Sequence, residues 1–457
     1  MAVFIIEKPD KNLTGDITLP ASKSISNRLL VIRALSPGPF LINNLSDSDD
    51  TRVLEDALKS DKNVINIGHA GTSMRFLTGY YAINPGERIL TGSERMKNRP
   101  VGDLVEALRY LGAEIQYAEK EGFPPLRIRG KKIEGGKISV NSSISSQFIS
   151  TLLMIAPVLK KGLEMKLTGK SVSPTYIELT LRLMQMFGIK YTREGSVINI
   201  RHQEYAPQDF TVEADWSSAS YWYEMASLAV KAEMVIRGLT QSGLQGDSVL
   251  PELFDGFGVK TEFINNGVKL TEKPVKISRF DYNFINQPDL VQTFAVLCAL
   301  KGIPFRFEGT QTLIVKETDR IQALKNELSK FGVKLESSSD GSRIEFSGTA
   351  AGTETIPGST KSATITTTRV QTTLESSKMT TGEENTPEAS MAKPGARTGA
   401  KASAIIISTY DDHRMAMAFA PVALLGHKID IENPEVVSKS YPCFWKDLTK
   451  VGFKIRQ

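Results

Sequence analysis

The chain has 457 residues, which is more than one hydrophobic core usually supports, so we expect at least two domains. Hydrophobic residues make up 40% of the chain and charged residues 23%, and this composition excludes general disorder. The formal net charge of +5 is too small over this length to indicate a nucleic acid or a membrane surface as partner.

Cysteine usage and the N-terminal residues bear on where the protein acts. Cys298 and Cys443 form neither a CxxC pair nor part of a metal-ligand cluster, which favours a reducing setting. Residues 1–9 lack the pattern of a secretion or import leader. The longest apolar stretches, such as residues 148–159, are shorter than the roughly 20 residues that span a bilayer. We therefore expect a cytoplasmic protein.

Helices and strands are predicted to alternate along the chain, which indicates an α/β protein. One pattern occurs five times: an amphipathic helix ends in an apolar residue, Gly follows as the C-cap, and an alternating strand comes next. The first four glycines, Gly112, Gly188, Gly258 and Gly332, lie 76, 70 and 74 residues apart. With a degenerate copy near residues 58–67, six repeated units are expected. The predicted helices begin near Ile25, Gly71, Pro100, Ser145, Tyr176, Ser217, Ser248, Pro288, Thr318 and Asp412.

The last repeat interval, from Gly332 to Gly452, is 120 residues long because it contains a Thr/Ser/Lys/Gly/Pro-rich tract at residues 349–403. No Phe, Tyr or Trp occurs between Phe346 and Tyr410, so the tract cannot bury enough apolar surface to fold. We expect a disordered surface insertion between two strands of the sixth repeat, at residues 343–346 and 404–407.

Hydroxyl and cationic residues gather where helices are predicted to start. Residues 19–28 (LPASKSISNR) place Lys23 and Arg28 around a first helical turn, and residues 68–75 (GHAGTSMR) supply a glycine-rich turn before the next helix. Arg99 precedes a proline at helix position N1. The N-H groups and the dipole at a helix N-terminus favour anions, and Lys and Arg add full charges.

Hydroxyl or charged residues also gather at predicted helix starts farther along the chain, at residues 145–147, 171–176, 316–320, 411–417 and 437–442. A single hydroxyl-rich helix start is usually only a cap. Six or more of them, spread over both halves, indicate one cleft that binds a ligand with several negative charges. The chain has no Gly-x-x-x-x-Gly-Lys-Ser/Thr loop and no Gly-x-Gly-x-x-Gly fingerprint, which argues against a nucleotide kinase or a dinucleotide enzyme.

These motifs, in this order, resemble those of the 5-enolpyruvylshikimate-3-phosphate (EPSP) synthase family from about Lys8 to Phe453, interrupted by residues 349–403. The resemblance implies a two-domain enolpyruvyl transferase fold, an inside-out α/β barrel with six βαβαββ repeats, three per domain. Residues 1–19 plus 214–457 would form the first domain and residues 20–213 the second, with the chain crossing between them twice.

The resemblance also implies the reaction of a 3-phosphoshikimate 1-carboxyvinyltransferase in the shikimate pathway of chorismate and aromatic amino-acid biosynthesis. The enolpyruvyl group of phosphoenolpyruvate would pass to the 5-hydroxyl of shikimate 3-phosphate, releasing phosphate. No cofactor and no metal are expected, and we expect a monomer that acts on these two small molecules.

Carried over by the matching motifs, Asp289 would be the general base, Glu317 the proton donor, and Lys23 a third catalytic residue. At Asp289, a first-turn carboxylate that stabilises the helix dipole is an open alternative from the residues alone. The phosphoenolpyruvate ligands would be Lys23, Gly71, Arg99, Gln147, Arg320, Arg414 and Lys439. The shikimate 3-phosphate ligands would be Lys23, Ser24, Arg28, Ser145, Ser146, Gln147, Ser173, Asp289 and Lys316.

The sequence departs from the family pattern at four positions. His69 stands where Asn is common, Phe76 where Pro is usual, Asn98 where Glu is usual, and Thr312 where many members use Asn. Altered binding geometry or inhibitor sensitivity is the expected consequence.

Two other functions compete with this interpretation. A UDP-N-acetylglucosamine enolpyruvyl transferase typically uses a loop cysteine in the first half of the chain, whereas this sequence has none before Cys298. A non-catalytic protein of the same fold would have no need of the intact charged motifs.

Overall fold

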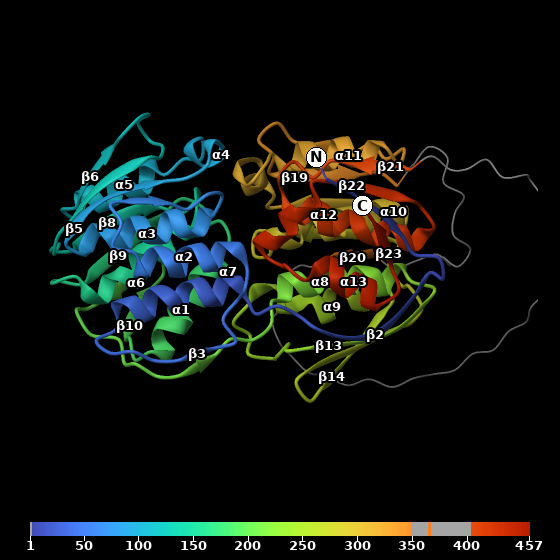
Figure 1. Cartoon of the computed structure of the whole chain (residues 1–457), viewed down its shortest axis with the longest axis horizontal. Coiled ribbons are helices and arrows are strands. Elements are labelled where there is room, and N and C mark those ends of the chain that lie inside the picture. The colour runs from blue at the N-terminus through green and yellow to red at the C-terminus, as the bar shows by residue number, and fades with distance from the viewer. Residues whose placement is uncertain (1, 349–363, 367–403) are drawn as a thin grey trace, which may run out of the picture.

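The computed structural model describes residues 2–348, 364–366 and 404–457. They form two α/β domains that lie side by side (Figure 1). The buried hydrophobic residues fall into two clusters. One cluster draws on residues 6–19 and 214–453, and the other on residues 21–212 together with Leu244.

The domain that contains residues 21–212 holds three sheets. In the first sheet the strand order is β4 (Val64–Asn66), β5 (Gly86–Thr91), β7 (Leu126–Gly130), β6 (Glu114–Tyr117). In the second it is β10 (Tyr191–Glu194), β11 (Val197–Ile200), β9 (Leu163–Thr168), β8 (Gly136–Asn141). The third sheet pairs β12 (Phe210–Thr211) with β3 (Ile42–Asn43). The helices are α1 (Lys23–Leu35), α2 (Asp49–Lys59), α3 (Gly71–Ile83), α4 (Glu94–Lys97), α5 (Gly102–Tyr110), α6 (Ser146–Ile155), η1 (Ala156–Val158) and α7 (Pro174–Met186).

The described residues of the other domain also form three sheets. In the first sheet the strand order is β21 (Ile405–Ile407), β22 (Ile429–Glu432), β1 (Val3–Glu7), β23 (Lys454–Arg456). In the second it is β14 (Val259–Ile264), β15 (Gly267–Glu272), β13 (Lys231–Arg237), β2 (Asn12–Thr18). In the third it is β18 (Glu336–Ser337), β19 (Arg343–Phe346), β17 (Phe305–Glu308), β16 (Arg279–Asn283), β20 (Thr364–Thr366). The helices are α8 (Trp216–Leu228), η2 (Gly246–Val249), α9 (Leu250–Asp255), η3 (Pro288–Leu290), α10 (Val291–Leu300), η4 (Gln311–Val315), α11 (Arg320–Ser329), α12 (His413–Phe419), η5 (Ala420–Leu425), η6 (Pro434–Lys439) and α13 (Phe444–Lys450).

Helices fill the inside of each domain, and sheets cover them. Every residue of α12 is buried, as is every residue of α8 except Ser217 and of α6 except Gln147. The strands alternate instead: β7 is buried, exposed, buried, exposed, buried along its five residues. An all-buried helix and a half-buried strand are what an apolar run and an alternating run predict, so the sequence pattern specifies which element lies inside.

The predicted repeat is present. Gly112, Gly188, Gly258, Gly332 and Gly452 follow the ends of α5, α7, α9, α11 and α13, and all five have a positive φ. Glycine adopts this left-handed conformation without a Cβ penalty. The strands after them are β6, β10, β14, β18 and β23, so helix, cap and strand follow one another as expected.

The placement of the Thr/Ser-rich tract needs one correction. We expected the strands on either side of it to share the sixth repeat, but β19 pairs with β17 and β18 in one sheet, and β21 pairs with β22 in another. The tract therefore connects two sheets. Within it, Thr364–Thr366 form β20, which pairs in parallel with β16 at the edge of the sheet, contrary to an insertion wholly outside the fold. The expectation for residues 349–363 and 367–403 falls outside the described residues.

In the part of the chain that the structure describes, the main chain passes between the two cores twice, and the two passages lie next to each other. Ala21 and Ala214 form an antiparallel bridge. The Ser22 N-H donates to the Glu213 carbonyl at 2.8 Å, and the Asp215 N-H donates to the Pro20 carbonyl at 2.9 Å. The helices that follow, α1 and α8, thus start from adjacent points, one in each domain.

Candidate active site

Helix N-termini from both domains converge on one cavity of about 140 Å³. The helices are α1, α3, α6 and α7 from one domain and α8, α10, α11 and α12 from the other, and first-turn residues of each, or the residues just before them, line the cavity. Thr72, Gln147 and Ser217 are among the few residues of their helices that are not fully buried, and all three face it. Positive helix ends gathered around one space favour an anion there.

The structure brings together the residues that the motifs predicted. All but one of them line this cavity: Lys23, Ser24, Arg28, Gly71, Arg99, Ser145, Ser146, Gln147, Ser173, Asp289, Lys316, Glu317, Arg320 and Arg414. The exception is Lys439, which lines a neighbouring cavity together with Asp49 and His69. The Lys439 Nζ still reaches the site, because it lies 3.0 Å from Glu317 Oε1.

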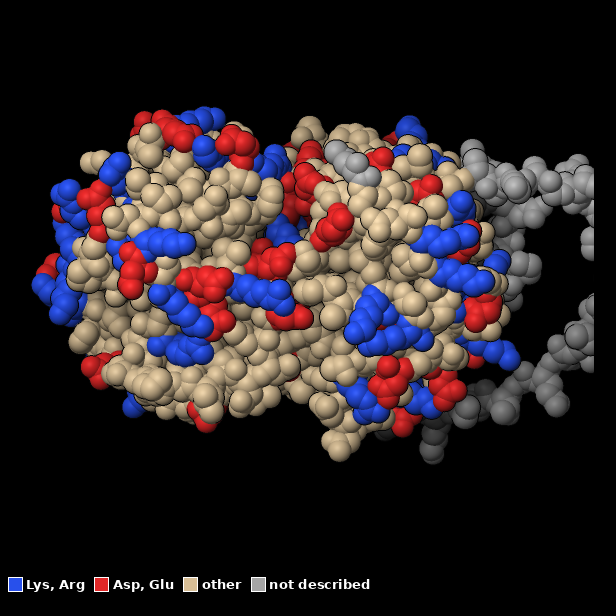
Figure 2. All heavy atoms as spheres, viewed as in Figure 1, with Lys and Arg blue, Asp and Glu red and all other residues tan. Residues whose placement is uncertain are grey.

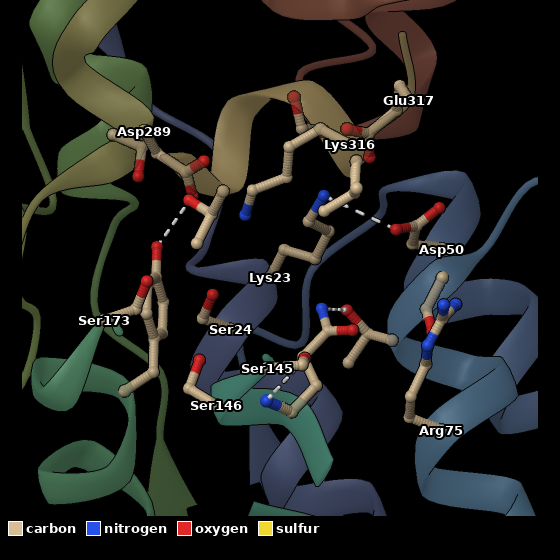
Figure 3. Close-up of a pocket in the computed structure, with 18 of the residues that line it drawn as sticks. Lys23, Ser24, Asp50, Arg75, Ser145, Ser146, Ser173, Asp289, Lys316 and Glu317 are labelled. Atoms are coloured by element: carbon tan, nitrogen blue, oxygen red, sulfur yellow. Dashed lines mark hydrogen bonds and ion pairs between the residues drawn. The ribbon is translucent and has the colours of Figure 1, made fainter. Parts of the chain in front are cut away.

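The two sides of the cavity differ in chemistry (Figure 3). Ser24, Ser145 and Ser146 lie on one side, and the charged groups of Asp289, Lys316 and Glu317 lie across from them. On the hydroxyl side, the Gln147 Nε2 donates to Thr72 Oγ1 at 3.1 Å, and the Ser145 hydroxyl caps α6 by accepting from the Gln147 N-H. That side offers neutral donors and acceptors suited to a hydroxylated, phosphorylated molecule.

Asp289 lies among several partners. Its carboxylate accepts from the Tyr176 hydroxyl at 2.7 Å and pairs with Arg414 at 3.0 Å and Arg320 at 3.3 Å. Burial opposes ionisation, but Arg414, Lys316 and Arg320 together hold the pKa of Asp289 well below its ordinary value. Asp289 is therefore a carboxylate at neutral pH.

Glu317 is the second carboxylate of the site. It pairs with Arg320 at 2.9 Å and with Lys439 at 3.0 Å. Burial again opposes ionisation, but Lys439, Arg320 and Arg99 hold the pKa of Glu317 well below its ordinary value. The Arg320 guanidinium thus connects both carboxylates, and its other edge binds Asp412 through two hydrogen bonds of 2.6 and 3.2 Å.

Three buried arginines have no carboxylate partner among the described residues. The Arg28 side chain donates to Thr180 Oγ1 at 2.7 Å, the Ser24 carbonyl at 2.9 Å and Ser150 Oγ at 3.1 Å. Arg75 donates to the carbonyls of Gly71 and Pro100, whereas the Nε of Arg99 is buried without a hydrogen-bond partner in the described chain. An unpaired buried charge is costly, so these cations indicate an anionic ligand.

Burial lowers the pKa of Arg28 to about 10 and that of Arg75 well below its ordinary value, with Arg99 adding repulsion at Arg75. Burial also lowers the pKa of Lys316, against the attraction of Asp289. All these shifts have the direction expected of cations that burial removes from water. A bound anion would reverse them.

Gly71 brings the main chain against Arg99. A Cβ at this position would lie 2.5 Å from Arg99 Nη1 and 2.9 Å from Arg99 Cζ. Glycine allows this close approach, because the guanidinium occupies the space that a side chain at position 71 would take.

Several residues of the site were not predicted from the sequence motifs. Asp50 pairs with Lys23 at 3.5 Å, and Tyr176 holds Asp289. Arg75 and His413 also line the cavity, and the ring nitrogens of His413 make no hydrogen bond within the described residues. Arg75, Tyr176 and His413 lie in motifs already identified by the sequence. Asp50 stands at the start of α2 with no motif of its own, so the sequence carries no signal for it.

The four departures from the family pattern have definite surroundings. The His69 Nδ1 lies 2.9 Å from Ser93 Oγ, and Asn98, which follows the last residue of α4, donates to the carbonyl of the first residue, Glu94. The Phe76 ring lies 5.5 Å from the Arg28 guanidinium, a cation–π contact. The Thr312 hydroxyl lines the cavity and is buried without a partner among the described residues.

Charges of both signs are interspersed on the face shown in Figure 2, including along the junction of the two domains. None of the described helices has the length and apolarity needed to cross a bilayer. The described residues contain no group of three or more His, Cys, Asp or Glu side chains arranged to hold a metal ion.

Solved structures with this architecture define the fold class. An EPSP synthase from Acinetobacter baumannii matches with a TM-score of 0.69 at 20% identity, with all of both chains covered. The enolpyruvyl transferase NikO from Streptomyces tendae matches with a TM-score of 0.66 at 14% identity, covering 99% of this chain and 98% of that one. The fold is that of the two-domain enolpyruvyl transferases.

Sequence comparison defines the family within that class. The model of the EPSP synthase (3-phosphoshikimate 1-carboxyvinyltransferase) family matches residues 7–60, 54–375 and 379–448. A 3-phosphoshikimate 1-carboxyvinyltransferase of Bacteroides fragilis (strain YCH46) is 44% identical over 455 residues, covering 99% of this chain and 98% of that protein. One from Mannheimia haemolytica is 32% identical over 479 residues, covering 98% of each. The chain belongs to the EPSP synthase family, which confirms the resemblance and the fold class expected from the motifs.

Proposed function

We propose that this chain transfers the enolpyruvyl group of phosphoenolpyruvate to the 5-hydroxyl of shikimate 3-phosphate, giving 5-enolpyruvylshikimate 3-phosphate and phosphate. One observation carries the proposal: buried arginines without carboxylate partners surround a cavity that also contains two ionised carboxylates, Asp289 and Glu317. Such a site can hold two anionic substrates in contact and still offer a base and an acid.

Phosphoenolpyruvate would lie on the cationic side of the cavity. Arginine guanidinium groups bind carboxylate and phosphate oxygens in pairs, and a lysine serves as a point charge. The groups assigned to phosphoenolpyruvate are Lys23, the Gly71 main chain, Arg99, Gln147, Arg320, Arg414 and Lys439. Arg99 fits best, because its guanidinium makes no ion pair with any described residue and faces the cavity.

Shikimate 3-phosphate would lie on the hydroxyl side, where serines and a buried arginine offer hydrogen bonds and charge. Arg28, held by Thr180 and Ser150, would face the phosphate with no carboxylate to compete. The groups assigned to this substrate are Lys23, Ser24, Arg28, Ser145, Ser146, Gln147, Ser173, Asp289 and Lys316. Lys23 would touch both substrates and offset the charge between them.

In the first step, the 5-hydroxyl oxygen adds to C2 of phosphoenolpyruvate while C3 gains a proton, which gives a tetrahedral intermediate. Asp289 would take the hydroxyl proton, and Glu317 would supply the proton to C3. Loss of phosphate and of one C3 proton then restores the double bond. When substrate anions replace the carboxylates as partners of Arg414 and Lys439, the pKa of Asp289 and Glu317 would rise toward the range that proton transfer needs.

We infer that the domains divide at residues 19/20 and 213/214, where the crossing segments pair. We further infer a cytoplasmic monomer of the shikimate pathway, which needs no cofactor or metal and has no nucleic-acid or membrane partner.

A phosphate-release assay tests the function. The protein is supplied with phosphoenolpyruvate and either shikimate 3-phosphate or UDP-N-acetylglucosamine as acceptor. Release with shikimate 3-phosphate alone is expected. Release only with UDP-N-acetylglucosamine would make the chain the sister transferase, and release with neither would leave a non-catalytic member of the fold.

A further inference from the structure

Arg95 contacts the other domain on the rim of the site. It lies in α4, which Figure 1 places at the edge of its domain facing the other domain. The Arg95 Nε donates to the Glu317 carbonyl at 2.8 Å, and its Nη2 donates to the Lys316 carbonyl at 3.4 Å. One guanidinium therefore spans the main chain of two successive residues assigned to the reaction.

The base of Arg95 is fixed to its own domain. Ser93 caps α4 by accepting from the Met96 N-H, and the Met96 side chain is buried in the core of that domain. Arg75, which lines the cavity, donates to the Met96 sulfur at 3.5 Å. A shift of the Lys316 and Glu317 main chain away from this domain would break the Arg95 hydrogen bonds, because the buried Met96 anchors α4 in its own domain.

Arg95 acts on position rather than on charge. The cations that most lower the pKa of Glu317 are Lys439, Arg320 and Arg99, whereas the hydrogen bonds of Arg95 go to carbonyl oxygens. Its two hydrogen bonds exist only when the domains are together, so they favour the closed arrangement by the free energy that they contribute. A charged donor to a carbonyl makes one of the stronger protein hydrogen bonds.

We propose that Arg95 is a positioning residue that holds the two domains closed and fixes the main chain of Lys316 and Glu317 at the site. The kinetic part of this proposal depends on the proposed function, whereas domain closure can be measured without it. Because both substrates lie between the domains, loss of closure lowers the fraction of protein able to bind either one.

The test compares Arg95→Ala with Lys97→Ala. Lys97 lies in the same helix, and its removal deletes the same charge, but its ion pairs with Glu94 and Glu119 stay within one domain. In Arg95→Ala we expect KM to rise about tenfold for both substrates by a common factor, which corresponds to about 1.4 kcal/mol. The thermal midpoint should fall by a few degrees at most, which shows that the variant is folded, and Lys97→Ala should match the wild type within twofold.

Two further measurements complete the test. Arg95→Lys should recover part of the loss, because an ammonium group can reach one carbonyl but cannot span both. Small-angle scattering of the ligand-free protein should give a larger radius of gyration for Arg95→Ala than for Lys97→Ala, and this result does not depend on any activity. Equal radii would overturn the proposal, as would an unchanged KM in Arg95→Ala or an equal loss in Lys97→Ala. An inactive wild type would refute the proposed function alone.

Discussion

Asp289 shows how one side chain depends on its surroundings. Viewed alone, it is a first-turn carboxylate of η3, a position where Asp often does no more than stabilise a helix start. In the folded protein it faces a buried cavity, is held by Tyr176, and lies between Arg320 and Arg414. Neither the tyrosine nor the arginines are near it in sequence.

Asp289→Asn should therefore separate binding from catalysis. Asparagine keeps the shape and can still accept from the Tyr176 hydroxyl, but it cannot take a proton, so turnover should fall by about 100-fold or more. Steady-state phosphate release gives the turnover, and calorimetry gives the dissociation constant for shikimate 3-phosphate, which should change by less than about tenfold. Near-normal turnover would exclude Asp289 as the base.

Gly71→Ala tests the contact between the main chain and Arg99. The new methyl group would lie 2.5 Å from Arg99 Nη1, so the guanidinium must move. If Arg99 binds phosphoenolpyruvate, KM for that substrate should rise about tenfold or more. KM for shikimate 3-phosphate should change much less.

Gly38→Ala is the control for this variant, because a Cβ at Gly38 makes only an ordinary 3.7 Å contact with Pro207. That variant should match the wild type in both constants. Equal changes of KM for the two substrates in Gly71→Ala would contradict a specific role of Arg99 toward phosphoenolpyruvate.

At the scale of elements, local patterns predicted most of the fold. Glycine caps marked the ends of five helices, and the strands that follow them are where alternation placed them. Local patterns did not predict which strands pair. For example, β1 lies between β22 and β23, which come from the other end of the chain. Which strands pair depends on long-range packing, and a run of a few residues carries little information about it.

Replacing residues 349–403 with a Gly-Ser linker of about ten residues tests whether the tract is needed. The described part of the tract, β20, adds three residues to the edge of a sheet beside β16, and the cost of closing a loop changes only slowly with its length. We expect turnover within twofold of wild type and a free energy of unfolding within about 1 kcal/mol. Activity assays and urea unfolding give these values, and misfolding or loss of turnover would show that the tract is structural.

At the scale of the whole molecule, crowded carboxylates make stability depend on pH. Asp247, in η2, is buried and accepts from the Ser217 hydroxyl. Burial, followed by the negative charge of Asp289, raises the pKa of Asp247 from 3.8 to about 7. Between these two values the folded protein retains a proton that the unfolded chain loses, so the free energy of unfolding falls as pH rises.

Asp247→Asn removes this titration. Relative to wild type, the variant should gain stability steadily from pH 4 to pH 7, by up to about 4 kcal/mol at 1.36 kcal/mol per pKa unit. The difference should level off above pH 7. Urea unfolding of both proteins at several pH values measures it, and taking the difference removes the contribution of every other group. A difference that stays constant with pH would show that Asp247 is ionised in the folded protein.

The sequence by itself determined the class of the protein and nearly all of the candidate site. Periodicity and glycine caps act within a few residues, and an anion-binding helix start such as that of Lys23 or Arg99 is a local arrangement, so both can be found without a structure. Only the tertiary structure decided that Asp50 pairs with Lys23, that Tyr176 holds Asp289, and that Arg95 reaches across to Glu317. Each of these contacts joins segments separated by 27 to 222 residues. The first forms when α1 and α2 pack within one domain, and the other two form only when the two domains come together.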